Sequence, residues 1–296
     1  MRVKRTFIVG DEWLYYKLYC GARTSDMLLV ETIKPLVEQL LEEKLIDSWF
    51  FIRYGDPDFH LRIRFHLLDL RKIGDIILRI NNVLQQYITQ RVVYKVQTDT
   101  YIRELERYGV STIEASEKLF FYDSAMLLDA ISVIEDEELY FLFVVKGVDK
   151  LLESFNYTLQ EKLNIVNRNT LAFKNEFHAD KRLNKQLDKK YRGLKSKLHS
   201  FLESSYSAED YAILDNILAH RKKKSLSIVK SIIDEQQFNR LEVELDDLLS
   251  SYIHMTVNRA FRSKQRFYEL VCYDFLLRYY KTKISYSKAD KEINKV

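Results

Sequence analysis

Residues that interrupt regular structure are scarce in this 296-residue chain, which has only 7 Gly and 2 Pro. Gly and Pro mark most turns and loops, so their scarcity predicts long helices and strands joined by few tight turns. The chain also lacks a hydrophobic run long enough for a signal peptide near its start or for a membrane span elsewhere. We therefore expect a soluble, cytoplasmic protein.

Cysteine is almost absent as well, because Cys20 and Cys272 are the only two in the chain. Their wide separation fits no metal-binding motif, and two free thiols in a chain of this size are typical of a reducing compartment. The sequence contains no Gly-rich phosphate loop, no G-x-S-x-G elbow and no H-E-x-x-H motif. It therefore gives no support to a nucleotide hydrolase, a serine hydrolase or a zinc enzyme.

Excess charge of one sign is also lacking, since 47 Lys and Arg against 43 Asp and Glu leave a net charge of only +4. A balance this even does not indicate direct binding to nucleic acid. Apolar material, in contrast, is plentiful: 47% of the residues are hydrophobic, and the chain has 20 Tyr and 17 Phe. That supply supports a large buried core and excludes a disordered chain.

The first 110 residues mix predicted strands with predicted helices. Alternating or aromatic-rich apolar segments predict strands over residues 12–20, 48–54, 59–67 and 91–98. Apolar residues at 3–4 spacing predict helices over residues 26–44 and 70–88. The resulting order, β-α-β-β-α-β, is that of a ferredoxin-like fold.

From about residue 112 onward the apolar residues recur at helical spacing. The predicted helices cover residues 117–131, 137–152, 154–167, 180–202, 208–218, 238–253 and 266–280. No low-complexity linker separates this part from the first. We therefore predict an α+β protein, in which a ferredoxin-like sheet region (1–110) packs with a mainly helical part (111–296) as a single domain spanning residues 1–296.

The most informative segment is residues 53–64, RYGDPDFHLRIR, which gathers three arginines and His60 around one predicted hairpin. Arg62 and Arg64 are two positions apart on a strand, so both side chains point to the same side, about 6–7 Å apart at roughly 3.3 Å per residue. Two guanidinium groups at that separation suit a carboxylate or a developing oxyanion. The alternative is an ordinary solvated face of an antiparallel strand.

A second segment, YIRELERYG, follows the last predicted strand of the mixed part. Glu104 and Arg107 are three residues apart in it, so a helical or turn backbone brings their side chains together. This pair either belongs to a site or is a solvated ion pair worth a few tenths of a kcal/mol.

Polar residues also interrupt two apolar helices. In the run ASEKLFFYDS, Asp123 and Ser124 are expected to satisfy buried backbone or partner groups. In YIHMTVNR, the i, i+4 spacing of His254 and Asn258 puts both on one helical face. His254 is either a hydrogen-bonded core residue or a group for proton transfer, because the unperturbed pKa of histidine, about 6.5, suits that role near neutrality.

Taken in order, five segments resemble the thiopeptide-type bacteriocin biosynthesis domain, which is also the elimination domain of class I lanthipeptide dehydratases. They are WLYYKLYCG, WFFIRYGDPDFHLRIRF, YIRELERYG, ASEKLFFYDS and IHMTVNR, and together they span nearly the whole chain. The most specific element is R-Y-x-D-P-x-x-H-[LI]-R-[LI]-R-F. Three positions depart from the family pattern: Arg103 replaces a Pro, Val110 a second Gly and Ala260 a Leu.

The resemblance implies glutamate elimination from glutamylated Ser or Thr of a ribosomally synthesised precursor peptide, which gives dehydroalanine or dehydrobutyrine. A larger, tRNA-dependent domain first esterifies the hydroxyl groups with glutamate, and this chain is too short to contain it. We therefore expect a lyase, one half of a split class I lanthipeptide dehydratase. Its expected partners are the glutamylated precursor peptide, a separate glutamylation protein, a cyclase and a second copy in a homodimer.

By resemblance, the expected catalytic residues are Arg62, Arg64, Glu104, Arg107 and His254. Arg62 or Arg64 would stabilise the enolate or bind the glutamyl group, and Arg107 would hold the leaving carboxylate. Glu104 would orient an arginine, and His254 would transfer the proton. The expected substrate-binding residues are Arg53, Tyr54, His60, Asn258 and Arg259. No metal or organic cofactor is implied, because proton transfer and charge suffice for this reaction.

Two alternatives to elimination stay open. Relatives with the same scaffold catalyse the [4+2] cycloaddition that builds the pyridine core of thiopeptides. A non-catalytic scaffold would instead bind a leader peptide, for instance as an added strand at a sheet edge, and recruit a partner dehydratase. The retained arginines and His254 favour elimination, since binding alone would not require them.

Overall fold

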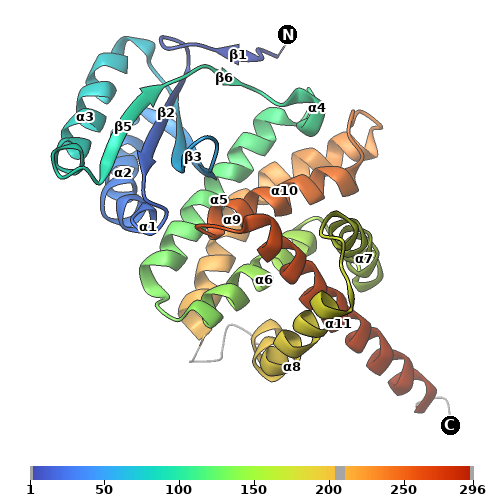
Figure 1. Cartoon of the computed structure of the whole chain (residues 1–296). Coiled ribbons are helices and arrows are strands. Elements are labelled where there is room, and N and C mark those ends of the chain that lie inside the picture. Colours follow the sequence, from blue (N-terminus) through green and yellow to red (C-terminus); the bar gives the residue numbers. More distant parts are fainter. Residues whose placement is uncertain (1–2, 204–210, 294–296) are drawn as a thin grey trace. The chain divides into compact units, whose positions relative to one another are not determined.

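The computed structural model describes residues 3–203 and 211–293, with side chains up to residue 286 in the second stretch (Figure 1). The predicted α+β class is confirmed. The chain divides into two compact units, one of Met1–Ile134 with Ser227–Ser263 and the other of Glu135–Leu226 with Lys264–Val296. This division differs from the expected parts 1–110 and 111–296, and the single-domain assignment stays a prediction.

The first unit is built on a four-stranded antiparallel sheet. Its strands are β2 (Trp13–Cys20), β3 (Ile46–Tyr54), β4 (His60–Leu67) and β5 (Val93–Thr98), in the spatial order β3-β4-β2-β5. All four lie where the sequence predicted strands. β4 is therefore inserted between β2 and β3, the arrangement of a split βαβ unit.

A second, two-stranded sheet was not predicted from the sequence. It pairs β1 (Thr6–Phe7) with β6 (Tyr101–Ile102) in antiparallel register. Strands of two residues are too short to show the alternation by which strands are recognised. This small sheet brings the start of the chain beside the segment that leads into Glu104.

Helices cover one face of the four-stranded sheet. The predicted helix 26–44 consists of α1 (Ser25–Leu28), a π-helical turn η1 (Leu29–Ile33) and α2 (Lys34–Glu42). The π-helical turn ends just before Pro35, which has no N–H for a regular helical hydrogen bond. The second predicted helix is a short 3₁₀ turn, η2 (Leu70–Lys72), followed by α3 (Ile73–Thr89).

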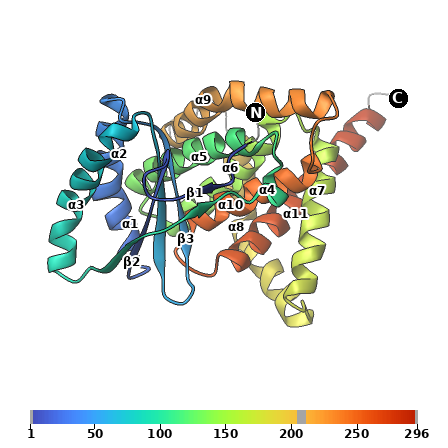
Figure 2. The same cartoon turned by 90° about the horizontal axis from the view of Figure 1, so that it is seen from above.

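The main core of this unit lies between that sheet face and these helices. Figure 2 shows α2 and α3 on the side of the sheet away from α5 and α10. Inward-facing residues of every strand enter the core, among them Leu14, Leu18, Phe51, Leu61, Ile63, Phe65 and Val93. They alternate with the residues of the opposite face, which is the face that carries Arg62 and Arg64.

The free edge of β3 is closed by α5 (Ile113–Val133) and α10 (Leu245–Ala260). The amide of Asn258 brackets the backbone of Arg53: its Oδ1 accepts from the backbone N–H at 3.1 Å and its Nδ2 donates to the carbonyl at 3.0 Å. Ser124 Oγ accepts from the backbone N–H of Phe51, and Arg259 Nε donates to the Phe51 carbonyl at 2.8 Å. The sheet and α10 are thus joined through an edge that would otherwise be open.

The second unit is helical in the residues described. It contains α6 (Glu137–Ser154), α7 (Leu159–Glu176), α8 (Lys181–Glu203) and α11 (Gln265–Ile293), whereas α9 (Ala212–Gln237) has residues in both units. Its buried charges are paired, as for Lys146 with Asp215 at 2.5 Å. Across the described residues, no helix is both long and apolar enough to cross a membrane.

Four of the helices predicted from residue 112 onward have wrong bounds, and one of them, predicted over 266–280, continues to Ile293. The helix predicted over 154–167 begins only at Leu159, because Thr158 and Glu161 form a capping box at its start. The helix predicted over 208–218 continues to Gln237, and residues 208–210 lie outside the described residues. The helix predicted over 238–253 begins at Leu245 and ends at Ala260.

Candidate functional site

The candidate site lies on the sheet face opposite the main core. On β4, His60, Arg62 and Arg64 occupy alternate positions and therefore share this face, as their spacing predicted. Arg64 lies opposite Tyr15 of β2 and Phe50 of β3, its neighbours on either side. The strand register thus places one aromatic residue on each side of Arg64.

Arg64 is buried in an aromatic cage. Its guanidinium carbon lies 4.3 Å from the ring centre of Tyr15, 4.6 Å from that of Tyr101 and 5.2 Å from that of Phe50. Cation–π contacts of this kind attract a cation, but they do not satisfy its hydrogen-bond donors. The side-chain Nε and Nη1 of Arg64 are buried and have no hydrogen-bond partner among the described residues.

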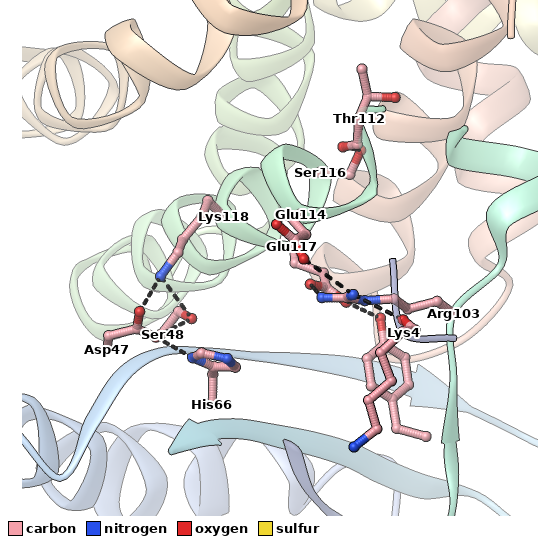
Figure 3. A network of polar contacts seen from close by, with 11 residues as sticks. Lys4, Asp47, Ser48, His66, Arg103, Thr112, Glu114, Ser116, Glu117 and Lys118 are labelled. Atoms are coloured by element: carbon pink, nitrogen blue, oxygen red, sulfur yellow. Dashed lines mark hydrogen bonds and ion pairs between the residues drawn. The ribbon is translucent and has the colours of Figure 1, made fainter. Parts of the chain in front are cut away.

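A buried network anchors the Tyr101 wall of this cage to α5 (Figure 3). Glu117 accepts a hydrogen bond from Tyr101 Oη at 2.7 Å and two from the Arg103 guanidinium at 2.8 and 2.6 Å. Arg103 also donates to the Lys4 carbonyl, and its second carboxylate neighbour, Glu114, is 3.4 Å away. The residue that replaces the family's Pro is therefore fully used in holding β6 and the following turn.

Figure 3 also shows a second polar network, in which Lys118 joins α5 to Asp47 of β3. Lys118 Nζ and His66 Nδ1 both lie 2.7 Å from the carboxylate of Asp47, and Ser48 Oγ donates to the same group. Partial burial opposes ionisation of Asp47, but these hydrogen bonds outweigh it and hold the pKa of the carboxyl well below its usual range. The two networks fix α5 against the sheet.

Arg62 lies on the half-buried part of the face. Its guanidinium is 3.4 Å from the ring centre of Tyr54, and its Nε donates to His60 Nε2 at 3.1 Å. His60 in turn donates from Nδ1 to the Asp58 carbonyl at 2.8 Å, which fixes the neutral tautomer. Burial lowers the pKa of His60, and the charges of Arg62 and Lys17 lower it further. Arg62 is thus oriented through Nε, while its two Nη groups make no hydrogen bond within the described chain.

The expected Glu104–Arg107 pair lies at the single helical turn α4 (Leu105–Tyr108). Their side chains meet at 3.3 Å and are 64% and 42% exposed, so the ion pair alone contributes little to stability. The turn ends at Gly109, whose φ is +72°, and a Cβ there would come within 2.7 Å of Glu242. Glycine is therefore required at this position, where the chain leaves the turn that carries Arg107 and Tyr108.

Arg259 reaches this region from α10. Its Nε is bound to the β3 edge, while Nη1 and Nη2 are buried without a hydrogen-bond partner among the described residues. The guanidinium lies 4.7 Å from the ring centre of Phe120 and 5.9 Å from that of Phe50. Complete burial lowers the pKa of Arg259 to about 10, an effect that the carboxylate of Asp123 offsets only in part.

Tyr108 completes a group that we call the buried arginine cluster: Arg64, Arg259 and Tyr108. The Tyr108 ring packs on Phe120 at 5.2 Å, and its hydroxyl is buried without a hydrogen bond of normal geometry. Burial raises the pKa of this hydroxyl, and the positive charges of Arg107 and Arg259 oppose the rise. An unsatisfied buried donor costs about 1–3 kcal/mol, and more when charged, so the cluster is energetically unfavourable without an added acceptor.

The remaining expected site residues lie elsewhere in this unit. Arg53 faces the main core, where its guanidinium is bonded to Ser25, Asp26 and the Arg259 carbonyl, so its side chain is committed to the fold. Asn258 is used in closing the β3 edge, as described above. His254 is half-buried on α10. Asp123 and Ser124 have the structural roles expected of them, with Asp123 accepting from Thr256.

Sequence reasoning missed the aromatic walls and Tyr108. The alternation of β2 and β3 places Tyr15 and Phe50 on the Arg64 face, so strand register could have identified both. Tyr101 and Tyr108 have no such signal, because the pairing of β1 with β6 and the turn at Gly109 position them. Within the described residues, no three or more His, Cys, Asp and Glu side chains gather as a metal ion requires.

Comparison with known proteins gives related sequences. The subtilin biosynthesis protein SpaB of Bacillus subtilis is 26% identical over 272 residues, which cover 88% of this chain and 24% of SpaB. The nisin biosynthesis protein NisB of Lactococcus lactis subsp. lactis is 31% identical over 134 residues, which cover 45% of this chain and 13% of NisB. The chain therefore spans about a quarter or less of the length of these relatives.

Solved structures share the fold at lower sequence identity. The tRNA-dependent lantibiotic dehydratase MibB from Microbispora sp. 107891 superposes with a TM-score of 0.71 at 19% identity, over 92% of this chain and 28% of MibB. The pyridine synthase TbtD from thiomuracin biosynthesis superposes with a TM-score of 0.66 at 12% identity, over 92% of this chain and all of TbtD. TsrL gives a TM-score of 0.61 at 13% identity, over 93% of this chain and 95% of TsrL.

A family model decides between a shared fold and a shared family. The model described as the C-terminal part of the lantibiotic biosynthesis dehydratase matches residues 13–280, which cover most of both compact units and include Arg62, Arg64, Arg107, His254 and Arg259. The chain therefore belongs to the family of lantibiotic biosynthesis dehydratase C-terminal domains.

Proposed function

We propose that this protein eliminates glutamate from glutamylated Ser or Thr residues of a precursor peptide, as a lyase. The observation that carries the proposal is the buried, unpaired guanidinium of Arg64 on the same face as Arg62, in a chain of this family. The reaction removes a proton from the α-carbon and expels a carboxylate from the β-carbon. Both the enolate and the leaving group are anions, and preorganised guanidinium groups stabilise such charges.

Each proposed role is assigned from how exposed the side chain is and from the residues that it already contacts. Arg62, oriented by His60 and Tyr54, has free Nη groups for the peptide carbonyl on which the enolate forms. Arg107 is exposed enough to meet a substrate and is steered by Glu104, so it is assigned the leaving carboxylate. His254, half-buried on α10, is assigned the proton transfer, which typically contributes 10²–10⁴-fold in rate.

The expected partners also belong to this proposal. In this proposal a separate glutamylation protein supplies the glutamylated peptide, and the two proteins act as a split dehydratase in the cytoplasm. The precursor peptide, a cyclase and a second copy of the chain are the further partners. No metal or organic cofactor takes part in the steps above.

The test is to incubate the purified protein with a glutamylated precursor peptide and to follow peptide mass. Elimination gives a peptide one water lighter than the unmodified peptide for each site, whereas hydrolysis returns the unmodified mass. We expect His254→Ala and Arg107→Ala to slow elimination by about 10²-fold or more. Arg71→Ala is the matched control, because Arg71 is 89% exposed and forms its ion pair with Asp69.

A second candidate function is the [4+2] cycloaddition. It is favoured by one observation, that this chain matches the whole length of the pyridine synthase TbtD. A glutamylated peptide that stays unchanged would count against elimination. Ring formation from a peptide that carries two dehydroalanines would then assign the cycloaddition.

A further inference from the structure

His60 lies on the site face of β4, but both of its ring nitrogens are bonded within the protein. The family resemblance implies a role in substrate binding, whereas His60 is only 1% exposed. Its Nδ1 lies 2.8 Å from the Asp58 carbonyl oxygen, and its Nε2 lies 3.1 Å from Arg62 Nε. The ring therefore has no free nitrogen for a substrate, and any effect of His60 on the reaction passes through its partners.

The two partners of His60 admit a single protonation state of its ring. The Asp58 carbonyl oxygen only accepts hydrogen bonds, so Nδ1 carries a hydrogen. The guanidinium of Arg62 stays protonated and only donates, so Nε2 carries no hydrogen and accepts through its lone pair. His60 is therefore neutral. A second proton on the ring would make two positively charged donors face each other in place of this hydrogen bond.

Neighbouring rings oppose a rotation of His60. Because β4 lies between β2 and β3, the strand register places Tyr19 and Tyr54 opposite His60, one on each side. Their ring centres lie 4.6 and 5.5 Å from that of His60. A rotation that moved Nε2 away from Arg62 would also break the hydrogen bond to Asp58. Protonation therefore changes the contact with Arg62 rather than the orientation of the His60 ring.

The hydrogen bond to His60 fixes the direction in which the Arg62 guanidinium points. The guanidinium carbon also lies 3.4 Å from the ring centre of Tyr54. Contact with a ring face attracts the guanidinium but leaves it free to turn over the ring, because the ring offers no directional acceptor. The bond from Arg62 Nε to His60 Nε2 removes that freedom. It thereby sets the direction of the two Nη groups, which the proposed function assigns to the substrate.

The surroundings of His60 favour its neutral form on balance. Burial lowers the pKa of His60 most, and the positive charges of Arg62 on β4 and Lys17 on β2 lower it further. The hydrogen bond to the Asp58 carbonyl and the charge of Asp56, both in the turn before β4, oppose this change. The two tyrosines packed against the ring are the other titratable groups that contact it. The pKa of His60 therefore lies below the ordinary value for histidine.

We propose that His60 is a positioning residue for Arg62, whose neutral ring orients the guanidinium toward the peptide carbonyl and whose protonation releases it. The inference rests on the proposed function, in which Arg62 stabilises the enolate. With His60 neutral, the Nη groups of Arg62 are preorganised for the developing oxyanion. With His60 protonated, Arg62 loses its hydrogen bond and is repelled by a second cation. The rate of elimination therefore depends on the protonation of two histidines, His60 and His254.

The protonation state of His60 can be measured without turnover. Long-range ¹H–¹⁵N spectra of the full chain with labelled histidine rings distinguish the Nδ1–H, the Nε2–H and the doubly protonated forms. The chain has 6 histidines, and the ring signals that are absent from His60→Gln belong to His60. We expect the Nδ1–H form near neutral pH. A His60 ring with its hydrogen on Nε2 near neutral pH would overturn the proposal, since it could not accept from Arg62.

The same spectra test the coupling of His60 to Arg62. Arg62→Met removes the donor and the positive charge, both of which favour the neutral ring. We therefore expect the pKa of His60 to be higher in Arg62→Met than in the wild-type protein. Arg71→Met is the control, because Arg71 is 89% exposed and forms its ion pair with Asp69. A pKa of His60 that is the same in Arg62→Met as in the wild-type protein would show that the two side chains are not coupled.

Elimination rates measured against pH test the effect on the reaction. As the pH falls, the wild-type rate should come to fall with the second power of the proton concentration, since His254 and His60 each take up a proton. His60→Gln keeps an amide oxygen that accepts from Arg62 but does not titrate. It should keep the neutral rate within roughly threefold and fall with only the first power. His66→Gln, on the same face of β4 but bonded to Asp47, should keep the wild-type steepness.

A variant without an acceptor separates positioning from folding. His60→Leu cannot hold Arg62, so its kcat should fall about tenfold or more with little change in KM, because the lost interaction acts in the transition state. His60→Gln should restore most of that loss.

The outcomes distinguish this inference from the proposed function. Equal steepness at low pH in the wild-type protein and in His60→Gln would overturn the positioning role and leave elimination standing. No elimination by the wild-type protein would overturn the proposed function, and the spectra of Arg62→Met would then decide whether His60 holds Arg62. If His60→Leu fails to fold, the pH dependence of His60→Gln decides.

Discussion

Arg64 and Arg103 are both buried in the first unit, but their surroundings differ. Arg103 has two carboxylate oxygens of Glu117 within 2.8 Å, whereas Arg64 has three aromatic rings and no acceptor for two of its nitrogens. The first arrangement stabilises the fold. The arrangement around Arg64 lowers the stability of the fold, and destabilising arrangements of this kind are concentrated at functional sites.

At this scale we predict that Glu117→Gln lowers the free energy of unfolding by roughly 3 kcal/mol, because it leaves the Arg103 charge buried without its partner. Glu114→Gln is the control, since Glu114 is 71% exposed and contacts the same guanidinium at 3.4 Å. Its effect should stay below about 0.5 kcal/mol. Urea unfolding measures both, and equal effects would show that the Arg103–Glu117 pair does not stabilise the fold.

The sequence predicted individual site residues where the spacing of two residues shows that their side chains lie close together. The two-residue spacing of Arg62 and Arg64 fixes their common face, and the three-residue spacing of Glu104 and Arg107 brings them together. Burial could not be predicted in the same way. Nothing in the spacing of Arg259 indicates that its guanidinium is enclosed, because that depends on packing against β3 and α5.

Among the elements, α10 links the sheet edge to the candidate site. The same helix carries His254, the amide that brackets Arg53, and Arg259. Movement of α10 relative to β3 would break hydrogen bonds at three atoms of the strand. The position of the proposed proton-transfer group is therefore fixed by strand contacts made one turn further along the helix.

We predict that Asn258→Ala destabilises the protein by about 2 kcal/mol, because two backbone groups of Arg53 lose their partners at a partly buried edge. Ser251→Ala, at a half-buried position of the same helix, should change the unfolding free energy by less than about 0.5 kcal/mol. Chemical denaturation compares the two variants. A smaller loss in Asn258→Ala than in the control would mean that water replaces the amide at no cost.

The elements of the first unit were predictable because alternation and 3–4 spacing persist over whole strands and helices. Errors arose where a local signal was overlooked or absent. The S/T-x-x-E pattern of Thr158 and Glu161 was available in the sequence and marks the true start of α7. The π-helical turn before Pro35 and the two-residue strands of the small sheet leave no periodic pattern to detect.

For the whole molecule we predict two stages of acid destabilisation. Burial lowers the pKa of His60 and His199, so the stability they contribute is present above about pH 6.5 and is lost as the pH falls through their folded-state values. The carboxyls of Asp47 and Glu153 also have lowered pKa values, the latter about 2. Their contribution is present above about pH 4.5 and is lost toward lower pH.

Thermal unfolding midpoints recorded from pH 8 to pH 3 measure this prediction. The His60→Gln/His199→Gln double variant should lose the first stage and keep the second. A midpoint that does not change between pH 7 and pH 5 in the wild-type protein would contradict the histidine contribution.

The two sheet edges of the first unit differ, and this difference limits how copies of the chain can associate. β3 has its backbone groups covered by α5 and α10, whereas the outer side of β5 is unpaired among the described residues. Two copies joined through β5 would form one continuous sheet whose outer edges are both β3, and both covered. Such pairing ends at two copies, so this sheet can form a closed dimer but cannot grow into a fibre.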